Sequence, residues 1–236
     1  MSDTHALGRG KSGMQRMKIR MVGVTAFITW LIFLIPPMVT AADPDDLTTL
    51  LSTNSCPGCD LSGADLRNLN LIGANLLGAL LEGALLDNAN LWKANLAGTA
   101  LKNARLIGAN LRDTNLSHAN LEGATLRGAN LKFTNASEAH FANADLRSVN
   151  LLHANLHGTD MTQANLSGAY IGWADLRESV LIAANLEGSI LLEANLEGID
   201  LTDMDLSSVQ LKNASLDGAS FCRTLTPWGQ DDRDCE

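Results

Sequence analysis

The sequence predicts an all-β solenoid, a chain wound into short coils that stack on one another. The main observation is that an apolar residue recurs at every fifth position from Leu61 to Phe221, and 28 of these 33 residues are Leu. A helix repeats every 3.6 residues and a strand every two, so neither explains a period of five. The repeat also runs without a slip, which indicates a single repetitive domain over residues 59–223.

Residues 1–42 precede the repeats and are predicted to be a signal peptide or a membrane anchor. Five basic residues and one acidic residue lie in this segment, and residues 21–42 carry no charge. Small residues follow Pro36-Pro37, so cleavage after Ala41 or Ala42 is the favoured interpretation. The alternative is a retained anchor, because residues 21–42 are long enough to span a bilayer. In both cases we expect the repeats outside the cytoplasm, in a periplasm, in a thylakoid lumen or secreted.

Residues 43–58 are predicted to form a capping helix and a C-x-x-C motif that leads into the repeats. Asp43 suits the N-cap and Pro44 the first turn, and the acidic residues that follow suit the positive end of the helix dipole. The apolar side expected to cover the first coil consists of Leu47, Leu50 and Leu51.

Each repeat has a central apolar residue whose neighbours have separate roles. The centre must be interior, and burying a Leu contributes ~1.5–3 kcal/mol. The residue two before it is Ala in 21 of 33 repeats, since two inward side chains share one short segment. Asn or Asp one before can bond nearby backbone groups. Gly or Asn two after tolerates positive φ at a corner. Each pentapeptide is therefore a short extended piece plus a corner.

Two centres depart from Leu in opposite directions. Ala136 is too small for an interior centre, and the next centre, Phe141, is larger than Leu. Since the two are adjacent within one coil, we expect the Phe141 ring to fill the space that Ala136 leaves.

The pattern A-(D/N)-L-x-x, seen for example at Ala109-Asn110-Leu111-Arg112-Asp113, resembles the pentapeptide-repeat family over residues 59–223. The resemblance implies a right-handed β-helix of square cross-section with four pentapeptides per coil, here a little over eight coils. The start, with S-C-P-G-C-D-L, and the end, 224–236, which is predicted to be a C-terminal tail or cap, are similar to exported bacterial members.

Four pentapeptides per coil place residues 20 apart on one face of the rod. We call the outward positions around centres 71, 91, 111 and every twentieth residue onward the Leu71 face. The other three faces are named in the same way after centres Leu61, Leu66 and Leu76. The Leu71 face has four basic and two acidic side chains, a net charge of +2. The Leu61 face has six acidic and two basic side chains, and the Leu76 face has five acidic and one basic. The apolar outward residues predicted to make the Leu71 face a protein-binding or dimerisation surface are Ile72, Trp92, Phe133, Leu152, Tyr170, Trp173, Ile190 and Leu192.

Columns of asparagine also follow from the spacing of 20. Ladders of Asn side chains bonded between coils are expected from two series, which are Asn70, Asn90, Asn110, Asn130 and Asn150, and Asn75, Asn95, Asn115, Asn135 and Asn155.

Four cysteines allow three pairings. Cys56 and Cys59 precede the rod and Cys222 and Cys235 follow it, so the rod separates the two pairs by more than the ~7 Å Cα reach of a disulfide. We therefore expect Cys56–Cys59 and Cys222–Cys235 bridges, as suits an exported protein. A redox role of C-x-x-C is the weaker alternative, because no thioredoxin-like pattern follows it. A zinc site is weaker still, since no histidine lies near.

No catalytic constellation, phosphate-binding loop or cofactor motif emerges from the sequence, so an enzyme is not expected. Residues 43–236 have 12 basic and 25 acidic side chains, a net charge of −13, which argues against binding nucleic acid. His153 and His157 could approach each other around a corner, but no carboxylate or cysteine set completes a metal site.

The favoured function is that of a non-catalytic exported scaffold that binds a protein partner, or a second copy of itself, through the Leu71 face. One alternative comes from the resemblance, since the family includes quinolone-resistance proteins that mimic DNA and bind DNA gyrase. The other is a membrane-anchored structural protein of the cell envelope, with membrane contact only if the N-terminal segment is uncleaved.

Overall fold

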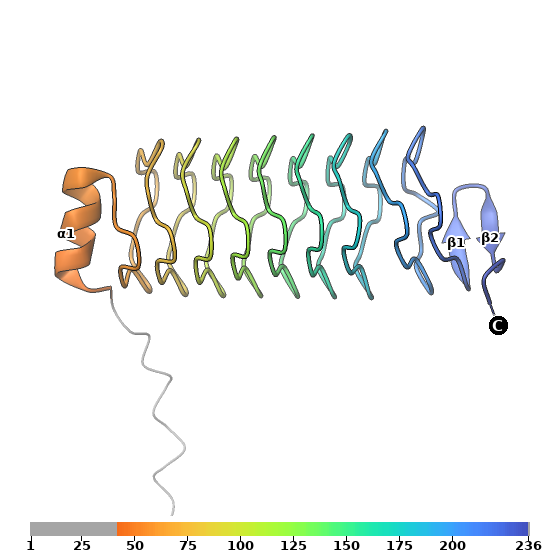
Figure 1. Cartoon of the computed structure of the whole chain (residues 1–236), viewed down its shortest axis with the longest axis horizontal. Helices are drawn as coiled ribbons and strands as arrows, with labels where there is room; N and C mark the ends of the chain where they lie inside the picture. Colours follow the sequence, from red (N-terminus) through yellow and green to blue (C-terminus); the bar gives the residue numbers. More distant parts are fainter. Residues whose placement is uncertain (1–41, 236) are drawn as a thin grey trace, which may run out of the picture. The chain divides into compact units, whose positions relative to one another are not determined.

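The computed structural model describes residues 42–235 (Figure 1). The predicted signal peptide or anchor, residues 1–42, lies outside this range except for its last residue. The described chain begins with helix α1 (Pro44–Thr53), continues as a series of coils, and ends with strands β1 (Thr224–Thr226) and β2 (Gly229–Asp231).

Parallel bridges between residues 20 apart join each coil to the next. Asn90 pairs with Asn110 and Asn110 with Asn130, for example, and the same relation recurs on all four faces. The bonds are short: the Leu111 amide donates to the Asn130 carbonyl at 2.7 Å. Four pentapeptides therefore form each coil, and the prediction of a repeat β-solenoid is confirmed. The extended pieces are so short that they form bridges rather than long strands.

The interior consists of the repeat centres and the small residues two positions before them. The centres from Leu61 to Leu206 are buried, and the inward alanines that accompany them are buried with few exceptions. Leu211 and Leu216, in the last coil, are half-buried because fewer residues cover them. Phe141 and Ala136 are both buried, at 1% and 0% exposure.

Corners have the positive φ that the Gly and Asn positions predict. Gly98 has φ 62° and Asn88 has φ 55°. The side chain one before each centre supports the corner, as at Asn120, whose Oδ1 accepts from the Glu122 amide at 3.0 Å. The asparagine columns bond between coils in several steps, among them Asn110 Nδ2 to Asn90 Oδ1 at 3.0 Å.

Helix α1 caps the first coil, and one detail of its prediction is wrong. Asp43 Oδ1 accepts from the Asp45 amide at 2.8 Å, which makes Asp43 the N-cap. Leu50 is 1% exposed and Leu47 packs against the core, but Leu51 is 58% exposed. The reason is geometric: the covered side of the helix is centred on Leu50, with Asp46 and Leu47 partly buried on either side of it, whereas Leu51 is turned about 100° away from Leu50.

The C-terminal end is closed by an antiparallel hairpin that the sequence patterns do not predict. Thr224 pairs with Asp231 and Thr226 with Gly229. The Leu206 amide donates to the Leu225 carbonyl at 2.6 Å, so β1 continues the ladder of the preceding coil. The hairpin thereby covers an edge that would otherwise be unpaired.

The ladder is interrupted at one place in the described range. The Met161 and Leu166 amides donate to the Val180 and Asn185 carbonyls, but one coil later the Leu181 and Leu186 amides have no backbone acceptor. We call the opening between residues 179–188 and 199–208 the coil gap.

Candidate functional site

The Leu71 face carries three rings in one column. Phe133, His153 and Trp173 are each two positions after a repeat centre and 20 residues apart, so they stand at the same corner of consecutive coils. The Phe133 and His153 rings are stacked with centroids 5.1 Å apart and 3° between planes. His153 and Trp173 follow at 5.2 Å and 20°. The three rings form one continuous stack along the rod.

These rings stand where the backbone favours glycine. Phe133 has φ 60°, His153 φ 58° and Trp173 φ 55°. For a side chain with a Cβ this conformation costs about 1–2 kcal/mol, and a bulky residue adopts it rarely. Thirteen repeats place Gly at this position, so the bulky rings are not required by the fold. The repeat therefore requires the backbone conformation at these corners but not the rings themselves.

Polar groups fix the ends of the aromatic surface. The Trp173 indole Nε1 donates to Glu193 Oε2 at 2.8 Å. The Trp92 indole Nε1 donates to Asp113 Oδ2 at 2.9 Å, and Arg112 Nε lies 3.2 Å from the same oxygen. Both indoles are thus held in defined orientations.

Cations lie against the rings on the same face. The Arg112 guanidinium lies 5.2 Å from the Phe133 centroid, and the Lys93 ammonium 4.9 Å from the Trp92 centroid. The Trp92 hydrogen bond, with the nearby Arg112 and Lys93 charges, holds the pKa of Asp113 below its ordinary value. Asp113 therefore stays ionised at neutral pH and links Trp92 to the Phe133 stack through Arg112.

Aliphatic residues extend the surface beside the stack. Tyr170 and Ile190 are neighbours in the ladder. Leu152 and Leu192 close around Gly172, where an added Cβ would lie 3.1 Å from Leu152 Cδ2 and 3.1 Å from the Leu192 carbonyl oxygen. Leu152 and Leu192 are therefore half-buried rather than fully exposed.

The structure brings most of the predicted face residues together but changes its composition. Ile72 is exposed, yet it lies in the coil before Trp92 and three coils before Phe133, the first ring of the stack. His153, which the sequence analysis treated only as a possible metal ligand, is the middle ring of the column. Its signal was available: it lies midway between Phe133 and Trp173 at the spacing of one coil.

The histidines do not approach each other as a pair. His153 stacks between two rings, whereas His157 Nε2 lies 3.5 Å from Glu178 Oε2. On the Leu76 face, His118 Nδ1 lies 3.2 Å from Glu138 Oε2. His118, His153 and His157 therefore each have a separate partner.

Both expected disulfides are present, Cys56–Cys59 and Cys222–Cys235. Asp46 lies beside the first, with its carboxylate within 4.8 Å of both sulfurs. Two oxidised sulfurs offer no thiolate, so this group is a poor metal ligand set as it stands. Asp46 Oδ2 instead accepts from the Asp60 amide at 2.7 Å and joins α1 to the first coil.

Helix α1 has ten residues, too few to cross a bilayer. Among residues 42–235 there is no helix that is long and apolar enough to do so.

Comparison with known proteins places the repeats in a recognised sequence class. The model described as pentapeptide repeats matches in eight copies, over residues 56–88, 84–123, 94–132, 124–163 and 164–203. A search of curated protein sequences finds no match.

Several solved structures are similar. HetL, a pentapeptide repeat protein involved in heterocyst differentiation regulation in the cyanobacterium Nostoc sp. strain PCC 7120, is 32% identical over 74% of this chain and 86% of its own, with a TM-score of 0.36. A pentapeptide repeat protein of the Arabidopsis thaliana thylakoid lumen is 27% identical over 44% and 65%, with a TM-score of 0.33. Full-length QnrB1, a plasmid-mediated fluoroquinolone resistance protein, is 18% identical over 70% and 92%, with a TM-score of 0.28.

Proposed function

The chain belongs to the pentapeptide-repeat family, and we propose that it is a non-catalytic rod that binds a protein partner outside the cytoplasm through its Leu71 face. The finer geometry implied by the family, a right-handed coil of square cross-section, is part of this proposal. Such a rod offers flat faces of fixed spacing, which suit recognition of an extended protein surface.

The observation that carries the proposal is the stack of Phe133, His153 and Trp173 at corners that favour glycine. Each ring is exposed, and each is kept in a conformation that costs free energy. Exposed aromatic residues that the fold does not need are typical of protein interfaces. Trp92 and Trp173 supply large apolar areas with few rotatable bonds, so little side-chain entropy is lost on binding.

The charges of this face indicate the chemistry of the partner. Four basic and two acidic side chains leave the Leu71 face at +2. A partner surface that combines apolar side chains with carboxylates would be complementary to it. The acidic Leu61 and Leu76 faces would repel the same partner, which selects one orientation of the rod.

An extracytoplasmic location is supported by the cysteines. All four are paired in disulfides, which persist in oxidising compartments and are rare in the cytosol. The basic and then apolar residues 1–42 are the second support. Retention of residues 21–42 as an anchor would place the same rod on a membrane surface.

The DNA-mimic alternative has weaker support. Duplex DNA carries one negative charge per about 1.7 Å of its axis, so a protein that mimics it needs a dense array of negative charges. In this rod Asp65 and Asp145, on the Leu66 face, pair with Arg67 and Arg147, and Asp175, on the Leu76 face, pairs with an arginine. These guanidinium groups neutralise carboxylates that DNA mimicry would require.

A matched pair of variants tests the proposed function. Trp92→Ser with Trp173→Ser removes both indoles of the face, whereas Trp228→Ser removes an indole that is 58% exposed in the C-terminal hairpin, away from the face. Crosslinking in intact cells should yield a protein adduct with wild type and with Trp228→Ser. Identification of the mature N-terminus of the crosslinked protein then shows whether residues 1–42 have been removed. Loss of the adduct in the double variant is expected, and an unchanged adduct would refute the Leu71 face as the binding surface.

A further inference from the structure

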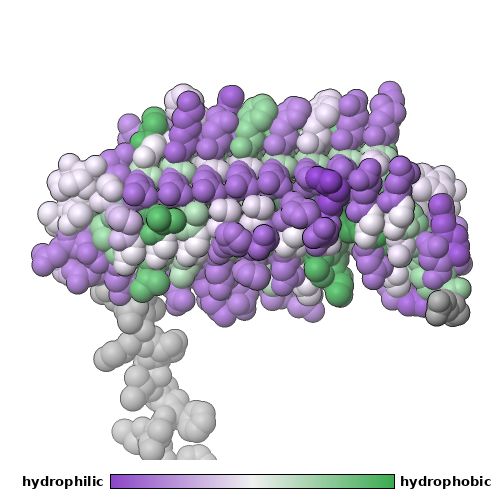
Figure 2. All heavy atoms as spheres, in the orientation of Figure 1, coloured by the Kyte–Doolittle hydropathy of each residue, from purple (hydrophilic) through white to green (hydrophobic). Residues whose placement is uncertain are grey.

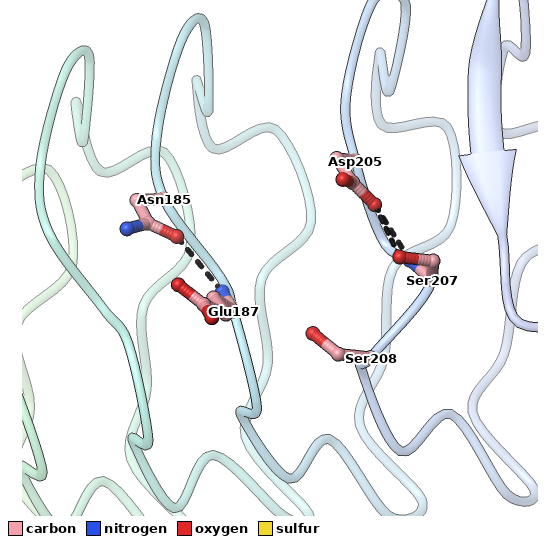
Figure 3. A pocket seen from close by; sticks show the side chains of 5 residues that line it. All are labelled: Asn185, Glu187, Asp205, Ser207 and Ser208. Atoms are coloured by element: carbon pink, nitrogen blue, oxygen red, sulfur yellow. Dashed lines mark hydrogen bonds between the residues drawn. The ribbon is translucent and has the colours of Figure 1, made fainter.

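The coil gap is a cleft with polar walls. Its volume is about 250 Å³. In Figure 3 the coil that carries Asp205 and Ser207 is visibly farther from the coil of Asn185 and Glu187 than the preceding coils are from one another. The space-filling view has a corresponding notch near the C-terminal end (Figure 2). The residues that line the cleft are Asn185, Glu187, Asp205, Ser207 and Ser208.

Unpaired backbone groups lie along both edges of the gap. One coil earlier, six bonds join the corresponding positions, for example Gln163 N–H to Ile182 O at 2.8 Å and Asn185 N–H to Ala164 O at 2.9 Å. Within the described chain, the equivalent amides at the gap have no backbone or side-chain acceptor. These amides belong to Leu181, Ala183, Leu186, Asp200 and Asp205.

The opening affects two adjacent faces, whereas the other two keep the ladder bonds of their repeat centres. On the Leu71 face the Leu191 amide still donates to the Gln210 carbonyl, and on the Leu76 face the Leu196 amide donates to the Ser215 carbonyl, both at 2.8 Å. At the corner, the Gly188 amide donates to Ser208 Oγ at 2.9 Å rather than to a carbonyl. The gap is therefore a wedge that opens on the Leu61 and Leu66 faces.

Two large inward residues coincide with the wedge. The position two before a centre is usually Ala, Ser or Thr, but the two open faces carry Ile199 and Met204 there, directly below Ser179 and Ala184. Ile199 and Met204 are 1% and 5% exposed, so their added volume lies between the coils. A core that is overfilled in this way relieves the crowding by moving backbone. Val149, at the same kind of position, keeps its ladder closed, so the smaller side chain is tolerated.

A ligand for the gap must satisfy backbone groups on both sides. Buried peptide N–H and C=O groups are nearly always paired, and unpaired strand edges accept a further strand. Ser179, on one edge, is only 6% exposed, and its hydroxyl has no hydrogen-bond partner among the described residues. These groups match an extended peptide, which offers donors and acceptors in two directions, better than a small anion or a metal ion.

The side chains around the gap define what such a peptide must carry. Glu187, Asp200 and Asp205 have no salt-bridge partner among residues 42–235. Val180 and Ile182, on the same edge, are 39% and 64% exposed. The surroundings thus combine carboxylates that lack a cationic partner with exposed aliphatic side chains.

We propose that the coil gap binds an extended basic segment of a protein partner, which enters as a β-strand between the two coils. Its backbone would pair with both edges, its outward lysine or arginine side chains would meet Glu187 and Asp205, and its apolar residues would contact Val180 and Ile182. This site is separate from the Leu71 face, so it would allow the rod to hold a second segment of the same or another partner.

The test uses the described chain with its disulfides intact and a labelled peptide of alternating lysine and valine as the probe. The variant Ile199→Ala with Met204→Ala should close the gap and weaken peptide binding by ~10-fold or more, while Val149→Ala, its matched control, should leave binding unchanged. The same peptide with N-methyl groups on alternate amides should bind poorly, because it lacks the donors that strand pairing needs. Equal binding by the N-methylated peptide or by the closed variant overturns the proposal.

A second arm covers the case in which the closed variant does not fold. Glu187→Lys with Asp205→Lys leaves Ile199 and Met204 in place and should still reduce binding by ~10-fold or more, whereas Glu122→Lys, on a closed part of the rod, should not. Hydrogen exchange should show the Leu181 and Leu186 amides becoming protected when the peptide binds. Unchanged hydrogen exchange would contradict the proposal. If closing the gap changed the oligomeric state and left peptide binding unchanged, the gap would instead be assigned to a second copy of this chain.

Discussion

The imidazole of His153 stacks on the indole of Trp173 with their centroids 5.2 Å apart, although both residues have the left-handed backbone conformation that glycine favours. Stacking on an exposed surface returns only part of the free energy that this conformation costs. The pair therefore makes sense as a binding surface more than as a source of stability.

His153→Gly should separate stability from binding. Loss of the two stacking contacts costs about 0.5–1.5 kcal/mol each, and relief of the strained backbone returns about 1–2 kcal/mol. We expect the free energy of unfolding in urea to change by no more than about 2 kcal/mol, while the crosslinked adduct weakens. Gln163→Gly, at an equivalent corner of the Leu61 face with φ 57°, should keep the adduct and gain stability. A large loss of stability in His153→Gly would show that the stack is structural.

Phe141→Leu should open a cavity beside Ala136. Both residues are buried, and a lost ring volume that neighbours cannot refill costs on the order of 1–3 kcal/mol. The double variant Ala136→Leu, Phe141→Leu restores the regular repeat and should recover most of that loss. Denaturant unfolding of the double variant and of the single variants Phe141→Leu and Ala136→Leu measures the coupling, and additive effects would disprove the packing of Phe141 against Ala136.

Acid should destabilise the rod through its aspartate–arginine pairs. The hydrogen bond from Arg67 lowers the pKa of Asp65 to about 2, and Arg147 and Arg177 lower the pKa of Asp145 and Asp175 in the same way. A lowered pKa means that the carboxylate takes up its proton at a lower pH in the folded state than in the unfolded state. The stabilisation is thus complete above about pH 4 and is lost as pH falls toward 2.

Thermal unfolding between pH 5 and pH 2 measures this effect. Asp65→Asn, Asp145→Asn and Asp175→Asn combined should give a lower Tm at pH 5 and a weaker dependence on pH. A triple variant with the same pH dependence as wild type would mean that other carboxylates control acid unfolding.

Removing the Cys222–Cys235 bridge should loosen the C-terminal end only. The bridge closes a loop between residues 13 apart, for which chain entropy predicts a contribution of roughly 3 kcal/mol. Cys222→Ser with Cys235→Ser should therefore speed hydrogen exchange in β1 and β2 and leave the coils near Leu111 protected. Uniformly faster exchange along the rod would show that the cap sets global stability.

The fold could be predicted almost completely from the sequence, because the residue types at the five positions of each repeat indicate which side chain is interior and where the chain turns. Leu at every fifth residue defines the interior, and Gly98 and Asn88 stand where positive φ is needed. The two disulfides followed from the separation of the ends. The hairpin at Thr224–Asp231 could not be predicted, since it lies after the last repeat and has no periodic pattern.

The candidate site could be predicted in part. A spacing of 20 placed Trp92, Phe133 and Trp173 on one face, but it could not say which side chains would touch. The membership of His153 required the ring orientations, and the half-burial of Leu152 and Leu192 required the backbone around Gly172. The wedge above Ile199 and Met204 was present in the sequence as two oversized residues, yet whether a coil absorbs them or opens depends on packing in three dimensions.

In a stacked array, each coil is stabilised mainly by its two neighbours, so one weak interface divides the cooperativity of the whole. The coil gap is such an interface, because two of four ladders are missing there. The coil that contains Leu201 and Leu206, together with the hairpin, should consequently melt as a separate unit before the longer N-terminal block. A pulling force or a protease would then meet two domains in energetic terms, although the repeat itself is unbroken.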